Sequence, residues 1–585
     1  MSFADLPVFD FLLQNGKRAY GYFGAHCEDN QVVFRVWASN AHKICLIGDF
    51  NGWQDGTELC QTNFGGVWEG RVSTEIASVG DRYKFRITDE NGTYDQSDPY
   101  AFFAEGTHQN ASIITDLSSY RWRDEGWIAF RNRNAEHFYS QPMNLYEVHL
   151  DSWRRHEDGH DYNYKELASD LAPYVKQMGY THIALLPVAE HSDEDSWGYE
   201  TVSPFAPSAK HGTPIEFMSF VDSMHEAGIG VLMDWCPWGA SLQEHSSDMA
   251  WALASNAFFW IEQYHMDGLR VAGFPPTLSP QDCLVDWHDF LKKLNRSLKQ
   301  TFPGVLLIAE NLSCSNQTSA FDQGGFGFDL VWNQAWSSDL FDYVALDPIW
   351  RKYHHEKMTF SLINAFEKKY LLPISHSDVS QGKKSFLDKM DGDYWQKFAG
   401  ARAFLGYMMT HPGKKMLFMG TEIGQFREWN PRSEIEWFLL EYESHAKLQR
   451  YVSELNHFYL SQAPLWQKDH SWDGFRWIDA DNRNQSILSF RRIASDGKEL
   501  IVLINFTPVV YEDFRLGVPI YGIYEEVFNS DREEYGGSGV TNTGSLKCES
   551  IAWNFLPQSV RLRIPPLGMT VLRCKRKAAK TSKKS

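Results

Sequence analysis

Residues Thr213 to Trp235 read TPIEFMSFVDSMHEAGIGVLMDW, a helical stretch that ends at a glycine and leads into a short, almost continuously apolar strand. The same order recurs on both sides, in YKELASDLAPYVKQMG before THIALLPV, in a helix from about 249 to 264 before DGLRV, and in one from about 286 to 301 before VLLIAE. Apolar strands that alternate with helices are typical of a parallel sheet. So many units in series predict a (β/α)8 TIM barrel. A doubly wound sheet is the weaker alternative, because no glycine-rich phosphate loop follows the first strand, NLYEVHL.

Alternating strands flank the barrel region on both sides. Segments such as VVFRVWA and DRYKFRIT, with an Asn-Gly turn signal in DENGTY, predict an N-terminal β-sandwich. Segments such as SILSFRRI and ELIVLINF predict a second all-β domain near the C-terminus. The expected divisions are a lead-in over 1–20, a β-sandwich over 21–117, the barrel over 118–471, a C-terminal β-sandwich over 472–574 and a basic, disordered tail over 575–585.

Composition limits the partners that the protein can have. A formal net charge of −19 repels phosphate backbones and anionic membranes, so we expect neither a nucleic acid nor a membrane as partner, and a neutral ligand fits better. Aromatic residues make up 15% of the chain, including 22 Trp and 26 Tyr. Such rings fill cores and interfaces, or stack on flat ligand faces such as those of sugars.

Cysteine usage and the first residues indicate the compartment. The eight cysteines show no CxxC pairing, which favours reduced thiols in a cytoplasmic protein and argues against a metal site. No cofactor is expected either. The N-terminus lacks a basic start followed by an apolar run, and no window of eighteen residues is apolar, so we expect a protein that is neither secreted nor membrane-spanning.

Polar residues close the predicted barrel strands, where a barrel keeps its reactive groups. Asp234 closes GVLMDW, Arg270 closes DGLRV and Glu310 closes VLLIAE. His376 closes LLPISH, and Tyr199 lies in SWGYE after THIALLPV. Each has a plainer alternative, because a strand-end aspartate can cap a helix and a histidine can be a satisfied buried group. Their joint placement with aromatic walls favours a site for a neutral polyol such as a sugar.

The amino-acid sequences of these segments and their order along the chain resemble those of the bacterial 1,4-α-glucan branching enzymes of the α-amylase superfamily. GDFNGW resembles part of the family's N-terminal glucan-binding module, YEVHLDSWRRH its barrel entry, and GKKMLFMGTEIGQFREWN and NSDREEYGGSGV later segments, so the likeness covers nearly the whole chain. The resemblance makes Trp37 and Trp53 candidates for glucan stacking in that module, with plain packing as the alternative. It makes Tyr199 the aromatic residue that stacks under the sugar.

The family implies a retaining transfer in which an aspartate attacks the anomeric carbon, a glutamate protonates the leaving oxygen and a third carboxylate orients sugar hydroxyls. Glu310 matches the glutamate, and Arg270 resembles the residue that holds the nucleophile's charge. The nucleophile's place in the DGLRVD pattern is Ala272, and the third carboxylate's place in SHDE is Ser377. On this resemblance the reactive set is incomplete.

Three further departures concern the rim of the site. The histidine of the DWVPxH pattern is absent, with Trp238 and Gly239 in that region, and Pro275 and Pro276 stiffen the segment after DGLRV. Asp234 and Asp267 are 33 positions apart, of which a helix takes about half, so little of the family's rim loop is left.

Two other carboxylates, Asp378 and Asp234, are the candidates for replacing the missing reactive groups. Side chains alternate along a strand, so Asp378 is expected to point away from the sugar. Asp234 resembles an aspartate that braces the pocket, and an inverting reaction would need a gap of about 6.5–9.5 Å between it and Glu310. We therefore predict a branching-enzyme-like protein of glycogen and α-glucan metabolism that does not transfer glycosyl chains efficiently. Its expected partner is α-glucan or, alternatively, another enzyme of glycogen metabolism that is itself active. The alternative is an active branching enzyme that moves α-1,4-linked chains into α-1,6 branches.

Overall fold

A computed structural model describes residues 16–63, 65–106, 110–236, 246–272, 287–310 and 325–575. Trp238, Gly239, Pro275, Pro276 and the tail over 576–585, all singled out above, lie outside the described residues. The chain forms two compact units, which are described separately. One comprises Met1–Ala135, His149–Pro173 and Ala184–Asp329, and the other comprises Glu136–Val148, Tyr174–Ile183 and Leu330–Ser585.

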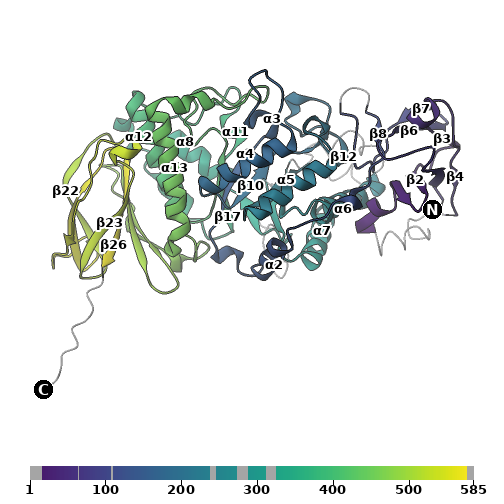
Figure 1. Cartoon of the computed structure of the whole chain (residues 1–585). Helices are drawn as coiled ribbons and strands as arrows, with labels where there is room; N and C mark the ends of the chain where they lie inside the picture. Colours follow the sequence, from purple (N-terminus) through teal and green to yellow (C-terminus); the bar gives the residue numbers. More distant parts are fainter. Residues whose placement is uncertain are drawn as a thin grey trace. The chain divides into compact units, whose positions relative to one another are not determined.

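Eight strands close into a barrel, which confirms the predicted (β/α)8 fold. In the sequence an all-β domain precedes the barrel and another follows it, and Figure 1 labels strands of both at the purple and yellow ends of the colour bar. Neighbouring strands pair in parallel wherever their register is defined, as for β13 with β14 and β17 with β18. In chain order the barrel strands are β9 (Asn144–Val148), β10 (His182–Leu185), β13 (Gly230–Trp235), β14 (Gly268–Val271), β15 (Leu306–Ala309), β16 (Leu330–Trp332), β17 (Tyr370–Ile374) and β18 (Lys414–Phe418).

Helices connect the barrel strands. The principal ones are α4 (Tyr164–Gln177), α5 (Pro214–Glu226), α6 (Ser246–Gln263), α7 (Trp287–Thr301), α8 (Gln334–Val344) and α12 (Tyr394–Thr410), and α13 (Glu443–Ser461) follows the last barrel strand. Helix α5 shows why the boundaries fall where they do. Thr213 and Glu216 form a capping box, in which the Thr213 hydroxyl accepts from the Glu216 N–H and the Glu216 carboxylate accepts from the Thr213 N–H. Gly228 then turns the chain with a φ of +79°, so β13 and its Asp234 start at a fixed point.

The N-terminal module is a β-sandwich. Phe34 and Tyr83, one from each sheet, meet edge to face in its core, with ring centroids 5.0 Å apart. One sheet contains β1 (Gly24–Glu28), β2 (Gln31–Trp37), β5 (Val67–Ser73) and β4 (Cys60–Gln61). The other contains β3 (Lys43–Gly48), β6 (Arg82–Asp89), β7 (Gly92–Gln96) and β8 (Ser112–Ile113).

The C-terminal domain is also built from two sheets, and the strands expected from SILSFRRI and ELIVLINF are its β20 and β21. The larger sheet contains β19 (Phe475–Asp479), β20 (Ile487–Ile493), β21 (Glu499–Asn505), β26 (Gly568–Lys575), β23 (Ile523–Asn529) and β24 (Leu546–Lys547). The smaller pairs β22 (Tyr511–Val518) with β25 (Gln558–Ile564). Among the described helices of the whole chain, none is long and apolar enough to cross a membrane.

A buried histidine between two carboxylates gives the first unit a pH-dependent element. His225, on α5, places Nδ1 2.8 Å from Asp124 Oδ2 and Nε2 3.0 Å from Asp267 Oδ2. Burial opposes the charge on this imidazole, but the Asp267 and Asp124 carboxylates outweigh it and raise the pKa of His225 to about 9. The imidazolium therefore stabilises the folded unit at neutral pH.

The stabilisation that His225 provides is expected to disappear in alkali. Because its folded pKa is above the unfolded value of about 6.5, the contribution is complete below pH 6.5 and is lost as the pH rises through 9. The gap in unfolding free energy between the wild type and His225→Gln should narrow by about 3 kcal/mol over that window. Denaturant unfolding at a series of pH values measures it. A gap that stays constant from pH 6 to 10 would show that folding does not raise the pKa of His225.

Candidate active site

A buried ion pair forms the centre of the site in the first unit. Asp234 on β13 and Arg270 on β14 are register partners, and the Arg270 guanidinium donates from Nε and Nη2 to the two oxygens of the Asp234 carboxylate. Burial favours a lower pKa for Arg270, but the neighbouring charges, Asp234 first among them, raise that pKa well above its ordinary value. Arg270 is therefore a permanent cation whose fork geometry fixes the Asp234 carboxylate.

Tyr199 joins the ion pair from the loop before β12 (Thr201–Pro207). Its hydroxyl donates to Asp234 Oδ2 at 2.6 Å and accepts from Arg270 Nη2 at 2.8 Å. The side chain is half-buried. The structure thus brings together Asp234 and Arg270 from two predicted strand ends and Tyr199 from a predicted loop, and their hydrogen bonds fix the position of the phenol.

Glu310 directly follows β15 and lies on the other side of the same arginine. Its Oε1 is 3.4 Å from Arg270 Nη1, and its backbone N–H donates to the Val271 carbonyl at 3.4 Å. The side chain is 26% exposed, whereas those of Asp234 and Arg270 are buried. Arg270 therefore bridges two carboxylates, and Glu310 is the more accessible of the two.

Ala272 directly follows β14. It is 1% exposed, and its backbone N–H donates to the Trp235 carbonyl at 3.3 Å. Its side chain is a methyl group, which supplies no oxygen for a bond to a sugar. Position 272 therefore continues the packing of the strand end without adding a reactive group.

His376 lies in the second unit and begins a helix, which differs from the prediction that it closes a strand. Strand β17 ends at Ile374, and α11 (His376–Val379) starts after Ser375, which caps it. The backbone N–H of His376 donates to Glu147 Oε2 at 2.9 Å, and Nδ1 lies 2.8 Å from Glu147 Oε1. Glu147, on β9, therefore fixes the orientation of the imidazole.

Ser377 and Asp378 belong to the same helical turn, so the alternation of a strand does not govern where they point. Ser377 Oγ lies 2.8 Å from Ser375 Oγ. The Asp378 carboxylate accepts from the Ser375 N–H at 2.9 Å and from its hydroxyl at 3.1 Å. Burial raises the pKa of Asp378. Its contacts are those of a helix cap rather than of a free nucleophile.

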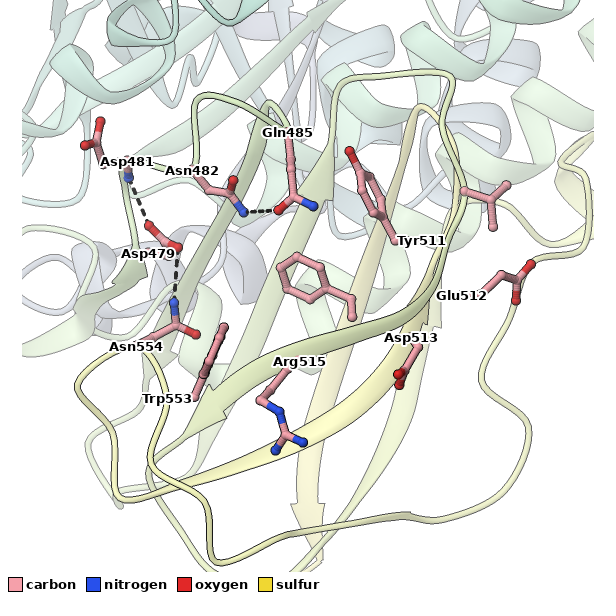
Figure 2. Close-up of a pocket in the computed structure, with 12 residues that line it drawn as sticks. Asp479, Asp481, Asn482, Gln485, Tyr511, Glu512, Asp513, Arg515, Trp553 and Asn554 are labelled. Carbon is pink, nitrogen blue, oxygen red and sulfur yellow. Dashed lines mark hydrogen bonds between the residues drawn. The ribbon is translucent and has the colours of Figure 1, made fainter.

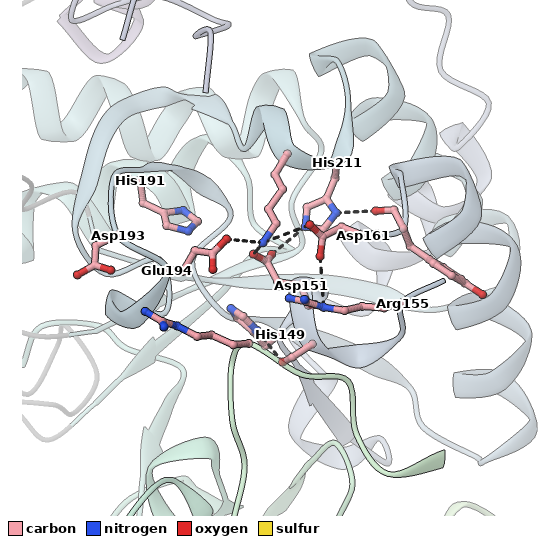
Figure 3. Close-up of polar contacts among 12 residues, drawn as sticks. His149, Asp151, Arg155, Asp161, His191, Asp193, Glu194 and His211 are labelled. Carbon is pink, nitrogen blue, oxygen red and sulfur yellow. Dashed lines mark hydrogen bonds and ion pairs between the residues drawn. The ribbon is translucent and has the colours of Figure 1, made fainter. Parts of the chain in front are cut away.

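A dense polar network in the first unit was not singled out from the sequence (Figure 3). Asp151 accepts from His211 Nε2 at 2.8 Å and from Lys210 Nζ at 2.8 Å, and the same ammonium donates to Glu194 at 2.9 Å. His149 lies beside it, and burial lowers its pKa to about 4, so the imidazole is neutral at pH 7. The sequence did contain a signal for this network, since the polar residues of HLDSWRRH directly follow NLYEV at the end of the first barrel strand.

The two tryptophans singled out for stacking lie in the N-terminal module. Trp53 has a φ of +62°, is half-buried, and donates from its indole nitrogen to Asp49 Oδ1 at 3.1 Å. The Arg82 guanidinium lies 6.0 Å from the centroid of its ring. Trp37 ends β2 and is also partly buried. Trp53 therefore has a ring held in place by a polar contact and still partly open to solvent.

Two family models match the ends of the chain. Residues 22–101 match carbohydrate-binding module 48 (isoamylase N-terminal domain), and residues 477–575 match the α-amylase C-terminal all-β domain. Solved structures share the fold: a mutant pullulanase from Paenibacillus barengoltzii complexed with maltotetraose has a TM-score of 0.69 at 17% identity and covers 95% of each chain. A pullulanase from an Anoxybacillus species complexed with maltotetraose has a TM-score of 0.70 at 15% identity and covers 94% of this chain and 87% of its own.

Curated relatives match over nearly the full length. The 1,4-α-glucan branching enzyme GlgB of Halothermothrix orenii is 41% identical over 614 aligned positions, which cover 95% of this chain and 97% of the relative. The GlgB of Aquifex aeolicus is 39% identical and covers 97% and 98%. The chain therefore belongs to the GlgB-type 1,4-α-glucan branching enzyme family of the α-amylase superfamily.

Proposed function

We propose that this protein binds α-glucan in glycogen metabolism and does not transfer glycosyl chains efficiently. The observation that carries the proposal is the buried methyl group of Ala272, at the end of the strand whose Arg270 joins Asp234 and Glu310 into one charged set. The set retains the groups that hold and polarise a sugar. It has no carboxylate at the position where the family's pattern carries the nucleophile.

The chemistry of retaining transfer explains why one methyl group matters so much. A carboxylate oxygen must form a bond to the anomeric carbon while the bond to the leaving sugar oxygen breaks and a second carboxyl group, about 5–5.5 Å away, supplies a proton to that oxygen. An acceptor hydroxyl then attacks the anomeric carbon and displaces the nucleophilic carboxylate, while the second carboxylate, now the base, takes the proton of that hydroxyl. Glu310 suits the role of acid and base, but Ala272 has no lone pair to offer in the first step.

Two other carboxylates, Asp234 and Asp378, already accept hydrogen bonds from their own surroundings. Both oxygens of Asp234 accept from Arg270, and one also accepts from Tyr199. Asp378 caps its own helical turn through Ser375. Either group would have to give up these bonds before it attacked a sugar. We therefore assign Asp234, Arg270 and Tyr199 in the first unit, and His376 in the second, to holding the glucan. Ser377 stands at the position where the family's pattern has its third carboxylate, so that group is missing as well.

The match to carbohydrate-binding module 48 and the identity to branching enzymes support binding of an α-glucan. Native electrophoresis tests this, because a protein that binds glycogen migrates more slowly in a gel that contains it. We expect retardation of the wild type and a weaker effect for Trp53→Ala. Phe130→Ala, which alters an exposed aromatic residue on α2 (Glu125–Arg133), is the matched control and should behave as the wild type. Wild-type migration that glycogen does not change would contradict the proposal and leave binding of a partner enzyme as the alternative.

A further inference from the structure

The C-terminal domain contains an open pocket that is lined by residues of this domain alone (Figure 2). It encloses about 780 Å³ and is lined by three segments, the loop after β19 (479–485), the start of β22 (510–515) and a turn at 553–554. This volume falls within the range of about 300–1,000 Å³ that is typical of small-molecule sites. The pocket is large enough for a ligand of several rings.

A tight turn forms one wall. Trp553 and Leu556 exchange backbone hydrogen bonds of 3.0 and 2.9 Å, and the two residues between them, Asn554 and Phe555, have φ values of +47° and +59°. Positive φ at both central residues is the geometry of a two-residue hairpin turn that usually contains glycine. A phenylalanine there is strained, and such strain persists only where the surroundings enforce it.

The surroundings enforce this turn through Asn554 and Gly517. The Asn554 amide accepts from the Gly517 N–H at 3.0 Å and donates to Asp479 Oδ2 at 3.1 Å, so it is held at both ends. A Cβ atom on Gly517 would lie 2.1 Å from the Trp553 carbonyl, so glycine allows the turn to sit directly against β22. The result is a rigidly placed Trp553 whose side chain is 48% exposed at the edge of the pocket.

The lining indicates a neutral, hydroxyl-rich ligand. Asn482 and Gln485 present amides joined by a 2.8 Å hydrogen bond, next to the carboxylates of Asp479 and Asp481. Of the four acidic lining residues, Asp481, Glu512 and Asp513 pair with Arg483, Arg563 and Arg561, and Arg515 pairs with Glu549, so most of the charge at the pocket is balanced and a neutral ligand fits it. Among the described residues, no group of three or more His, Cys, Asp and Glu is arranged for a metal ion. Planar polar side chains beside an exposed indole suit sugar hydroxyls and the apolar face of a pyranose ring.

We propose that this pocket is a second α-glucan-binding site, in which Trp553 is the stacking surface and the amides and carboxylates of 479–485 bond to sugar hydroxyls. The identity of the ligand rests on the function proposed above, whereas the location rests on the pocket itself. A chain held here would tether the protein to a glucan independently of the barrel and of the N-terminal module.

Hydrogen–deuterium exchange of the full-length protein with maltoheptaose locates the site. We expect slower exchange in peptides that cover 479–485 and 551–557. Cellohexaose, a β-linked glucan, should give no protection if the ligand is an α-glucan. Protection confined to 22–101 would overturn the second site and leave the proposed function intact, whereas no protection anywhere would contradict both.

Exchange measured at a series of maltoheptaose concentrations then tests the residue, because the protection of 479–485 reports binding at this pocket rather than at the barrel or the N-terminal module. Trp553→Ala is expected to weaken this binding by roughly three- to tenfold, the loss of one aromatic stack, and Trp553→Phe to restore part of it. Ile551→Ala is the matched control, because Ile551 is also 48% exposed but does not line the pocket. Equal affinities for Trp553→Ala and Ile551→Ala would overturn the assignment.

Discussion

Branch formation on amylose is expected to be about a millionfold slower than that of the Halothermothrix orenii GlgB assayed beside it. Loss of a catalytic nucleophile costs about this much in enzymes where it has been measured, because the reaction loses its covalent route. Ala272 provides no oxygen for that route, and the contacts of Asp234 and Asp378 keep both carboxylates occupied. New chain ends counted after enzymatic debranching measure the rate.

Glu310, the retained acid, provides the control for this assay. Glu310→Gln should leave any residual rate unchanged, because an acid without a nucleophile contributes nothing to transfer. Branching that is readily detected in the wild type and abolished in Glu310→Gln would show an active enzyme with a rearranged site. In that case the alternative, chain transfer from α-1,4 to α-1,6 linkages, would be the correct function.

Replacement of Arg270 by methionine is expected to destabilise the first unit by about 3–5 kcal/mol. The change removes the cation that neutralises Asp234 and leaves a buried carboxylate whose remaining described hydrogen bond comes from the Tyr199 hydroxyl. Denaturant unfolding followed by tryptophan fluorescence measures the loss. Methionine keeps most of the side-chain volume, so the effect reports the lost charge rather than a cavity.

A double variant separates the charge from the packing. Arg270→Met with Asp234→Leu removes both charges, and we expect it to recover much of the stability that the single change loses. If the double variant were as unstable as the sum of the two single variants, the ion pair would not be the reason for the loss.

The fold was predictable because its signals are local. The helix and strand in Thr213–Trp235 follow from a capping box, a glycine and an apolar run, and the structure places α5 and β13 there. The grouping of Asp234, Arg270 and Glu310 was predictable too, since a barrel brings its strand ends together.

Contacts between distant segments were not predictable. The network of Asp151 with Lys210 and His211 joins residues about sixty positions apart, and nothing in the local pattern pairs them.

The helical turn at His376 was missed for a local reason. LLPIS is apolar up to its last residue and therefore predicts a strand that His376 closes, but the capping box of Ser375 and Asp378 starts a helical turn instead. Local hydrogen bonds of this kind compete with strand pairing and are visible only in three dimensions.

Covalent trapping is the measurement that tests the central claim most directly. A fluorinated glucosyl fluoride gives retaining enzymes a stable glycosyl ester, because the nucleophilic carboxylate displaces fluoride and the second step is slow. Intact mass spectrometry should show no added sugar on this protein, and one added sugar on the Halothermothrix orenii GlgB treated in parallel. A sugar adduct on the wild-type chain, mapped to Asp234, Asp378 or any other carboxylate, would contradict the claim that Ala272 has left the site without a nucleophile.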